Sequence, residues 1–468
     1  MGVASRFGFD DAIREGRELG KSLGEEAEIR DMVVTAIYRR AEAIVGKVAS
    51  QTRKTSPDWD KRIDDVLTSR LVGYPLMLAL LGFVLWLTII GANYPSNILA
   101  ALFSVIEDQL TGLFSLWGAP AWLHGLVVLG TYRGLAWVVS VMLPPMAIFF
   151  PLFTLLEDLG YLPRIAFNLD NLFKRSGAHG KQALTMAMGF GCNAAGVMAA
   201  RIIESPREQM IAILTNNFIP CNGRFPLLIA MSTMFLGVGI LGYGNVLASL
   251  AVAGMILFGI AMTFLVSYLL SKTMLKGISA SFTLELPPYR KPQVVQVLVR
   301  SVFDRTLFVL WRAVKVAAPA GALVWVLANW HIGDMSIIGH MAGYLDPFAR
   351  LIGMDGFILL AFILGLPANE IVIPILLMSY LGTGALLELD SLSTMKALLV
   401  SRGWTWLTTL NVMVFSLLHF PCGTTLLTIH HETGGWKWTV VAALLTTITA
   451  VAVCFLITQG ARIWQLVP

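Results

Sequence analysis

The chain has 468 residues, of which 56% are hydrophobic and only 13% are charged, and its mean hydropathy is +0.72. Soluble domains carry about 25% charged residues, so this composition excludes an ordinary soluble protein and predicts an all-α polytopic membrane protein. The net charge of +5 is too small to indicate a nucleic-acid partner. Four cysteines, none in a CxxC pair, exclude a disulfide framework.

Residues 1–70 form a polar region in which acidic and basic residues are interleaved. Its apolar residues recur at near-helical spacing, which predicts amphipathic helices outside the bilayer. These residues include Ile29, Val33, Ile37 and Ile44. The run EGRELGKS (Glu15 to Ser22) is similar to a phosphate-binding loop, but Glu15 stands where that motif needs glycine and no buried strand precedes it. We therefore expect a charged helix there and no nucleotide site.

A series of apolar segments follows this region. A membrane-spanning helix needs about 20 apolar residues, and residues 71–91 meet that requirement. Residues 98–116 contain Glu107 and Asp108, so we expect an external helix that lies along the membrane interface. The later candidate spans are 133–156, 181–201, 208–236, 245–271, 307–330, 356–381, 396–420 and 438–461.

Basic residues predict the orientation of these spans, because Lys and Arg concentrate in cytoplasmic loops. The regions rich in Lys and Arg are 1–70, 160–181 and 272–306. The regions poor in them are 92–132, 331–355 and 383–393. The N-terminus is therefore expected in the cytoplasm. With this orientation, residues 181–201 must enter and return on the inner side and residues 356–381 on the outer side.

Two pairs of short motifs indicate an internal repeat. GFGCNAA (Gly189 to Ala195) resembles GLPANEI (Gly365 to Ile371), and FIPCNG (Phe218 to Gly223) resembles HFPCGT (His419 to Thr424). Broken helices survive in a membrane only where protein or a water-filled cavity satisfies their backbone, so we expect two inverted repeats that face a polar site near the midplane. The predicted domains are the segment 1–70, a first span with an external helix at 71–130, a first repeat at 131–275, a cytoplasmic loop at 276–306 and a second repeat at 307–468.

The broken segments contain residue types that bind metal ions. The candidate ligands are Cys192, Asn193, Cys221, Asn222, Asn369, Glu370 and Cys422, with Asn216, Asn217 and His419 nearby. Thiolates with carboxamide and carbonyl oxygens suit a borderline-soft divalent metal such as Fe²⁺, Mn²⁺ or Zn²⁺. Glu370 is an intramembrane acid, and such residues mark ion or proton pathways. The alternative for each cysteine is a small buried hydrophobe, which we expect for Cys454 in the apolar run VAVCFLIT.

Other polar groups lie near the ends of predicted spans. Glu157 and Asp158 end a span on the cytoplasmic side, where they form either an exit for a cation or an ordinary solvated helix end. The run HHE (His430 to Glu432) has metal-binding residue types, but we expect it in a cytoplasmic surface turn.

At these residues the sequence resembles the membrane domain of the FeoB ferrous iron transporters. The matching stretches run in family order from about Asp64 to the end and include LEDLGYLPRIAFNLDNLF, GAHGKQALTMAMGFGCN, ARIIESPREQMIAILTNNFIPCNGRFPLL, FTLELPPYRKP, GLPANEIVI and FPCGTTLLTIHHETGGWKW. The resemblance implies import of Fe²⁺ across a bacterial plasma (inner) membrane through two Gate, or nucleoside-recognition-like, repeats. It places the family's iron-path cysteine at Cys192 and its Pro-Cys cysteines at Cys221 and Cys422. Fe²⁺ is then the transported substrate, and no permanently bound cofactor is expected.

Two features depart from the family. The chain continues from GFGCN into Ala194 and Ala195 where the family has Val-Pro, which leaves the metal preference open. No phosphate loop occurs, so the family's N-terminal GTPase domain is expected to be missing from this chain. The resemblance then implies a separately encoded GTPase or a FeoA-like protein as partner, a homo-oligomer, or transport without nucleotide.

Two functions remain as alternatives to metal transport. One is a nucleoside permease built from Gate-type repeats, although a nucleoside site needs aromatic stacking more than facing thiols. The other is a membrane scaffold subunit that does not transport. An enzyme is not expected, because the sequence shows no nucleophile–base set and no ATP motif.

Overall fold

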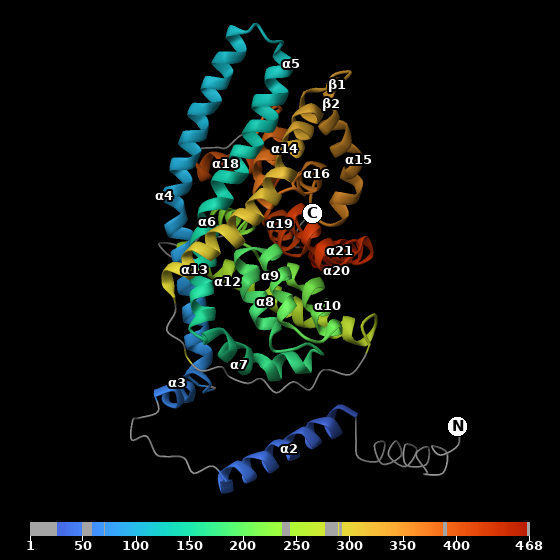
Figure 1. The fold of residues 1–468 in the computed structure, drawn as a ribbon. Helices are drawn as coiled ribbons and strands as arrows, with labels where there is room; N and C mark the ends of the chain where they lie inside the picture. Colours follow the sequence, from blue (N-terminus) through green and yellow to red (C-terminus); the bar gives the residue numbers. More distant parts are fainter. Residues whose placement is uncertain are drawn as a thin grey trace, which may run out of the picture.

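The computed structural model describes residues 26–48, 59–69, 71–235, 244–276, 289, 293–386 and 391–465. The described chain is almost entirely helical (Figure 1). Its strands are β1 (His331–Ile332) and β2 (Met335–Ser336), an antiparallel pair whose turn contains Gly333 at φ +65°. The predicted all-α class is confirmed.

The described residues contain six helices long and apolar enough to cross a membrane, or seven if one bent pair counts as a single span. The long helices are α4 (Gly73–Leu116), α6 (Arg133–Asp158), α12 (Gly244–Lys272), α14 (Leu307–Asn329) and α21 (Trp436–Ile463), and the sixth span joins α19 (Trp406–Leu418) to α20 (Gly423–Thr433). The bent pair is α15 (Ile337–Leu351) with α16 (Gly356–Leu364), which meet at 109°. The chain is thus a multi-pass membrane protein, as its composition predicts.

The N-terminal region contains helices α2 (Glu26–Val48) and α3 (Trp59–Leu67), and the run EGRELGKS lies outside the described residues. Figure 1 shows α2 apart from the helical bundle. In contrast, α3 is attached, because Asp64 accepts hydrogen bonds from Arg164 Nε at 3.0 Å and from the Tyr289 hydroxyl at 2.7 Å. Burial raises the pKa of the Asp64 carboxyl, but the hydrogen bonds from Arg164 and Tyr289 outweigh this effect and leave that pKa below its ordinary value.

The first two long elements form an antiparallel hairpin. Helix α4 has 44 residues, about 66 Å at 1.5 Å per residue, and packs against α6. The short α5 (Ala121–His124) and the π-helical η1 (Gly125–Tyr132) lead into α6. The turn of this hairpin stands beyond the rest of the bundle in Figure 1.

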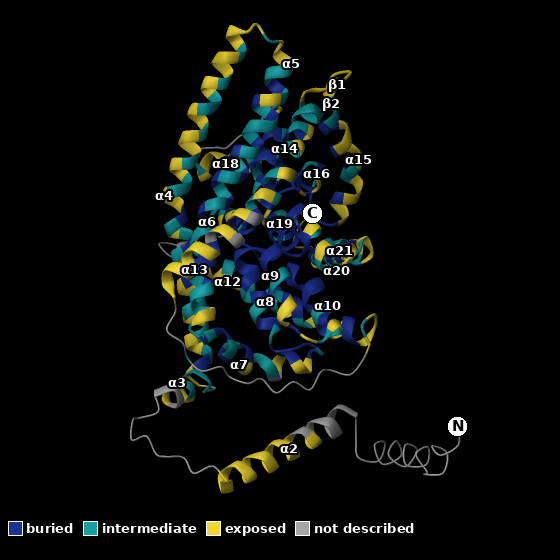
Figure 2. Ribbon diagram, in the orientation of Figure 1, coloured by how far each residue is buried: buried dark blue, intermediate teal, exposed yellow. Residues whose placement is uncertain are grey.

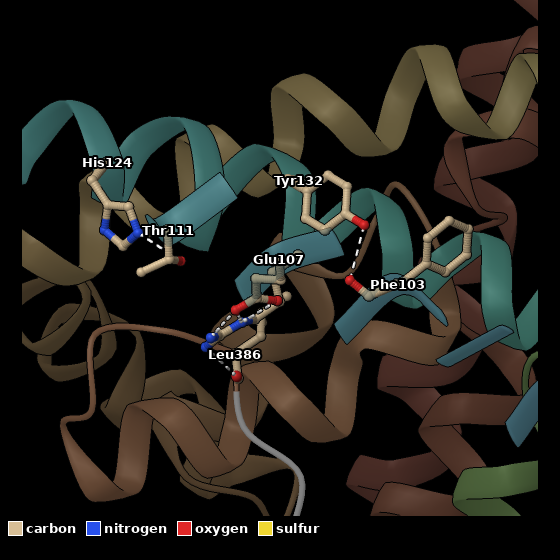
Figure 3. A network of polar contacts seen from close by, with 7 residues as sticks. Phe103, Glu107, Thr111, His124, Tyr132 and Leu386 are labelled. Atoms are coloured by element: carbon tan, nitrogen blue, oxygen red, sulfur yellow. Dashed lines mark hydrogen bonds and ion pairs between the residues drawn. The ribbon is translucent and has the colours of Figure 1, made fainter. Parts of the chain in front are cut away.

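The expectation of a separate interfacial helix at 98–116 is wrong, because these residues continue α4. The acidic group that suggested an interface is neutralised inside the hairpin, where Glu107 forms an ion pair with Arg133 (Figure 3). The Tyr132 hydroxyl donates to the Phe103 carbonyl at 2.9 Å, and Arg133 Nη1 reaches the Leu386 carbonyl at 3.5 Å. These contacts hold α4 along its neighbour.

Two units of broken helices fill the rest of the bundle. The first unit comprises α7 (Tyr161–Arg175), α8 (Gln182–Gly191), α9 (Asn193–Ala199), η2 (Ala200–Ile202), α10 (Pro206–Thr215), η3 (Asn216–Phe218) and α11 (Phe225–Phe235). The second comprises α15, α16, η5 (Asn369–Ile371), α17 (Val372–Leu381), α18 (Leu392–Ser401), α19 and α20.

The expected span at 396–420 is in fact two helices, because the chain turns at Gly403 (φ +87°) before α19 begins. Helices α13 (Val294–Arg300) and η4 (Ser301–Thr306) lead into α14, and most of the predicted loop 276–306 before them lies outside the described residues.

The two units share a local geometry where each amphipathic helix turns into the following half-helix. In the first unit, Asp170 Oδ1 accepts from the Gly180 backbone N–H at 3.0 Å, and in the second, Asp346 Oδ1 accepts from the Gly356 N–H at 3.0 Å. Each acid stands ten residues before its glycine. A basic residue one turn later pairs with each acid, and a glycine with positive φ follows it. These residues are Lys174 and Gly177 (φ +70°) in the first unit, and Arg350 and Gly353 (φ +73°) in the second. This likeness supports the predicted repeat, while the opposite orientation of its copies stays a prediction.

The core lies where the broken helices meet. Figure 2 shows buried residues concentrated around α8 and α9, whereas the described side chains of α2 are exposed. The fully buried aromatic side chains come from both units and from α6; they include Phe149, Phe150, Phe218, Phe362 and Phe415. The breaks are therefore enclosed by protein on several sides.

Candidate functional site

The first break of each unit has the same backbone conformation. Cys192, between α8 and α9, has φ −155° and ψ 125°, and Ala368, between α16 and η5, has φ −153° and ψ 128°. These residues occupy matching positions in the GFGCN and GLPAN motifs. Gly191 is required beside the first break, because a Cβ there would collide with the Phe149 ring.

The second break of each unit hydrogen-bonds to the first. The Asn222 N–H donates to the Gly191 carbonyl at 3.4 Å, and the Gly423 N–H donates to the Leu366 carbonyl at 2.6 Å. Backbone groups freed in one break thus find partners in the other, which is the condition for non-helical chain inside a membrane.

The breaks of both units line one enclosed cavity of about 20 Å³. All seven ligands predicted from sequence lie in its wall: Cys192, Asn193, Cys221, Asn222, Asn369, Glu370 and Cys422. Since a water molecule needs about 10–15 Å³ measured in this way, the cavity has room for one small particle. It is too small for an organic ligand, whose sites occupy about 300–1,000 Å³.

Two methionines in the wall were missed by the sequence prediction. Met142 and Met146 of α6 also line the cavity, and methionine carries a thioether sulfur that can bind soft metals. Their separation of four residues around Pro144 and Pro145 places them on one helix face and could have indicated them. Methionine in an apolar span is usually a packing residue, so the sequence alone gives only a weak signal for them.

A buried polar network outside the cavity wall links the two units. Arg224 is fully buried, and its Nη1 donates to the carbonyls of Asn217 at 2.6 Å and Leu417 at 2.8 Å. Asn217 Nδ2 donates to the His419 carbonyl at 2.6 Å, and Arg224 Nη2 donates to Asn217 Oδ1 at 3.1 Å. Asn217 and His419, which the sequence placed near the ligands, thus join the two units and are not part of the cavity wall.

Two residues of the wall, Asn369 and Glu370, carry oxygens with unused bonding capacity. Asn369 Oδ1 is buried without a hydrogen-bond partner, and no ion pair among the described residues includes Glu370. Gly223 allows the Glu370 carboxylate to approach, because a Cβ at Gly223 would collide with it. Within the described part of the chain, no group of three or more His, Cys, Asp and Glu side chains can hold a metal by itself. A cation in this cavity would therefore also use carboxamide, thioether, carbonyl or water ligands.

The structure places the remaining candidates away from the cavity. Glu157 and Asp158 are exposed in the last turn of α6, so their role as a cation exit stays a prediction. Cys454 of α21 is fully buried, and its thiol faces the Asn411 carbonyl at 3.6 Å. The HHE run forms the end of α20 and is not a loop turn.

Comparison with known proteins points to one family. The Gate family, described as nucleoside recognition, matches residues 139–236 and 310–436, and the ferrous iron transport protein B C-terminal family matches residues 252–304. The Fe(2+) transporter FeoB of Staphylococcus aureus is 31% identical over 423 residues, covering 86% of this chain and 60% of that protein. The FeoB of Methanocaldococcus jannaschii is 28% identical over 94% of this chain and 64% of that protein.

A third relative is the Fe(2+) transport protein A/Fe(2+) transporter FeoB fusion protein of Porphyromonas gingivalis, which is 27% identical over 94% of this chain and 56% of its own length. The chain thus spans about 60% of the length of such relatives. No solved structure matches the chain significantly. The resemblance that the motifs predicted is confirmed.

Proposed function

Because the chain is a FeoB-type membrane domain by its matches to the Gate and FeoB C-terminal families and to curated Fe²⁺ transporters, we propose that it carries Fe²⁺ across the bacterial plasma membrane. The single observation that supports this most is the convergence of three cysteines on a cavity with room for one ion. The cysteines come from both repeats, and the wall adds the Glu370 carboxylate and amide oxygens.

The chemistry of this wall favours a borderline-soft divalent ion. Thiolate and thioether sulfur bind Fe²⁺ better than they bind Mg²⁺ or Ca²⁺, which prefer oxygen alone. Cys192 and Cys422 are also the N-cap residues of α9 and α20. The N-terminal end of a helix favours negative charge, which suits a metal-bound thiolate. Ion binding should then release protons from the thiols.

The repeated broken helices support transport by alternating access at a site near the membrane midplane. In this proposal the repeats lie in opposite orientations and the N-terminus is cytoplasmic. The partner is a separately encoded GTPase or a FeoA-like protein; the fusion found in Porphyromonas gingivalis supports the latter.

A nucleoside permease is the second candidate, because the Gate family is described as nucleoside recognition. The cavity of about 20 Å³ argues against it, and its wall contains no aromatic ring on which a base could stack. The proposal for Fe²⁺ therefore stands ahead of it.

The deciding experiment is uptake into proteoliposomes with Fe²⁺, Mn²⁺, Zn²⁺ and uridine compared side by side. We expect Fe²⁺ to enter and to compete with the other two metals, while uridine stays outside. Uridine uptake without metal uptake would establish the permease, and no flux of any solute would leave a scaffold as the function.

A further inference from the structure

Two half-helices lead away from the cavity and pack against each other. Helix α9 begins after Cys192 and α20 begins after Cys422, and both cysteines line the cavity. Beyond α9, η2 carries Arg201, and the last turn of α20 carries Glu432. The eleven residues of α20 cover about 16 Å. The first repeat and the second thus meet again at the far end of this helix pair.

At that far end, Arg201 holds Glu432 by a two-pronged ion pair. Arg201 Nε lies 2.6 Å from Glu432 Oε2, and Nη2 lies 2.7 Å from Oε1. The two side chains differ in exposure: that of Glu432 is 6% exposed, and that of Arg201 is 60% exposed. A nearly buried carboxylate needs a cation, because an unpaired buried charge costs several kcal/mol. An arginine that reaches in from solvent supplies this cation.

A second metal-binding group stands beside the carboxylate. His431 Nδ1 lies 3.7 Å from Glu432 Oε1, and the imidazole is largely exposed, so it is free to turn toward an ion. Carboxylate oxygen with imidazole nitrogen suits divalent transition metals, and water can complete the shell.

Polar side chains lie along α20 between the cavity and the ion pair of Arg201 with Glu432. Cys422 Sγ lies 3.2 Å from Thr425 Oγ1, and the buried Thr428 follows one turn later. With Glu432 four residues further on, these side chains fall on one side of the helix at spacings of three and four. The hydroxyl oxygens of Thr425 and Thr428 thus lie between Cys422 and Glu432 along α20, and Arg312 Nη1 donates to the Thr428 hydroxyl at 3.0 Å.

We propose that Glu432 and His431 form a second, exit site for the transported divalent cation, and that Arg201 occupies the carboxylate until the ion arrives. This inference rests on the proposed function. When the ion binds Glu432, Arg201 is displaced into solvent and the link between α9 and α20 is lost. Arrival of the ion and separation of the two repeats at this end are then one event.

The alternative is that the ion pair between Arg201 and Glu432 only stabilises the contact between α9 and α20. Exchanging the two charged residues distinguishes this structural role from an exit site. In the double variant Arg201→Glu with Glu432→Arg, the ion pair is restored, but a cation now stands where the exit carboxylate was. If the exchanged pair re-forms, which a wild-type unfolding temperature would report, the structural role is retained, whereas an exit ligand is lost.

The test is Fe²⁺ uptake by proteoliposomes containing Glu432→Gln, His431→Ala or the exchanged pair. Arg350→Gln serves as the matched control, because Arg350 Nε lies at the same 2.6 Å from Asp346 and the Arg350 side chain is likewise exposed. We expect the exchanged pair to unfold at the wild-type temperature yet to lose about tenfold in uptake, as does Glu432→Gln, since removing a group that orders a metal typically costs about 10–100-fold. His431→Ala should lose less, and Arg350→Gln nothing.

Wild-type uptake by the exchanged pair, or by Glu432→Gln, would overturn the exit site. Equilibrium binding of radioactive Fe²⁺ to purified protein distinguishes this failure from that of the proposed function. Glu432→Gln should retain binding at the cavity, whereas Cys192→Ser should lose it. Absence of Fe²⁺ binding and uptake in the wild type would instead remove the proposed function and the exit site together.

Discussion

At the scale of single residues, the local sequence around a cysteine separates the cavity from the packing. Cys192, Cys221 and Cys422 each interrupt a helix and line the cavity, whereas Cys454 lies within an uninterrupted helix and is buried among apolar side chains. Thiol chemistry is the same at all four positions. The backbone conformation decides which thiols line the cavity and which pack inside a helix bundle.

Replacement of Cys192 by Ser should therefore reduce Fe²⁺ uptake by about tenfold or more, a loss typical of damage to a metal site. The hydroxyl keeps the size of the side chain but is a poor ligand for a soft ion. Cys454→Ser is the control, because its hydroxyl can donate to the same Asn411 carbonyl. Both variants should insert to the wild-type level, and equal uptake by the two would contradict a role of Cys192 in the ion path.

Among the described residues, Glu370 is the only carboxylate in the cavity wall, so its charge should matter more than its shape. We predict that Glu370→Gln, which keeps the side-chain volume, lowers Fe²⁺ uptake and changes its dependence on external pH. The matched control is Glu204→Gln, since Glu204 is largely exposed and pairs with Lys181 at the surface. An unchanged rate and pH profile in Glu370→Gln would assign that residue a structural role.

At the scale of helices, the sequence predicts breaks better than it predicts continuity. Gly, Pro and Asn in apolar segments identified the interruptions at Cys192 and near Glu370, because those residue types act locally. The division of residues 71–116 into two elements was wrong, since the ion pair that stabilises the continuous α4 comes from Arg133 on another helix. Convergence of the seven ligands was expected from the repeat, but Met142 and Met146 come from α6, outside the repeated motifs.

Attachment of α3 gives a prediction at this scale. Asp64→Asn should release α3 from α7, because the neutral side chain loses its charge-assisted bond to Arg164. In the wild type the Asp64 pKa is lowered on folding, so this attachment should persist above the pKa of the free carboxyl and weaken as pH falls through the lower folded value. Hydrogen exchange of residues 59–67 would report the release. Asp65→Asn, at an exposed neighbouring position, should leave exchange unchanged.

At the scale of the whole molecule, the bundle and the N-terminal helix α2 are built differently. The bundle encloses its broken helices, whereas the described apolar side chains of α2 are exposed (Figure 2); they include Met32, Val33, Ile37, Ile44 and Val45. An apolar helix face without a core of its own favours a partner surface. The exposed apolar side chains of α2 therefore predict a partner that covers them.

Removal of residues 1–55 should weaken association with a partner while the bundle stays folded, because the Asp64 contact and all candidate spans lie beyond that point. Pull-down from native membranes, with and without the segment, would identify a GTPase, a FeoA-like protein or a second copy of the chain. Equal recovery of the same partner by both forms would place the docking surface on the bundle.

The small cavity has a consequence for the kinetics of transport. With room for one particle, it cannot hold the row of ions that push one another through a channel by mutual repulsion. Each ion must also leave most of its hydration water behind on entry. If the chain carries Fe²⁺ as proposed, flux should therefore saturate without cooperativity as external Fe²⁺ rises.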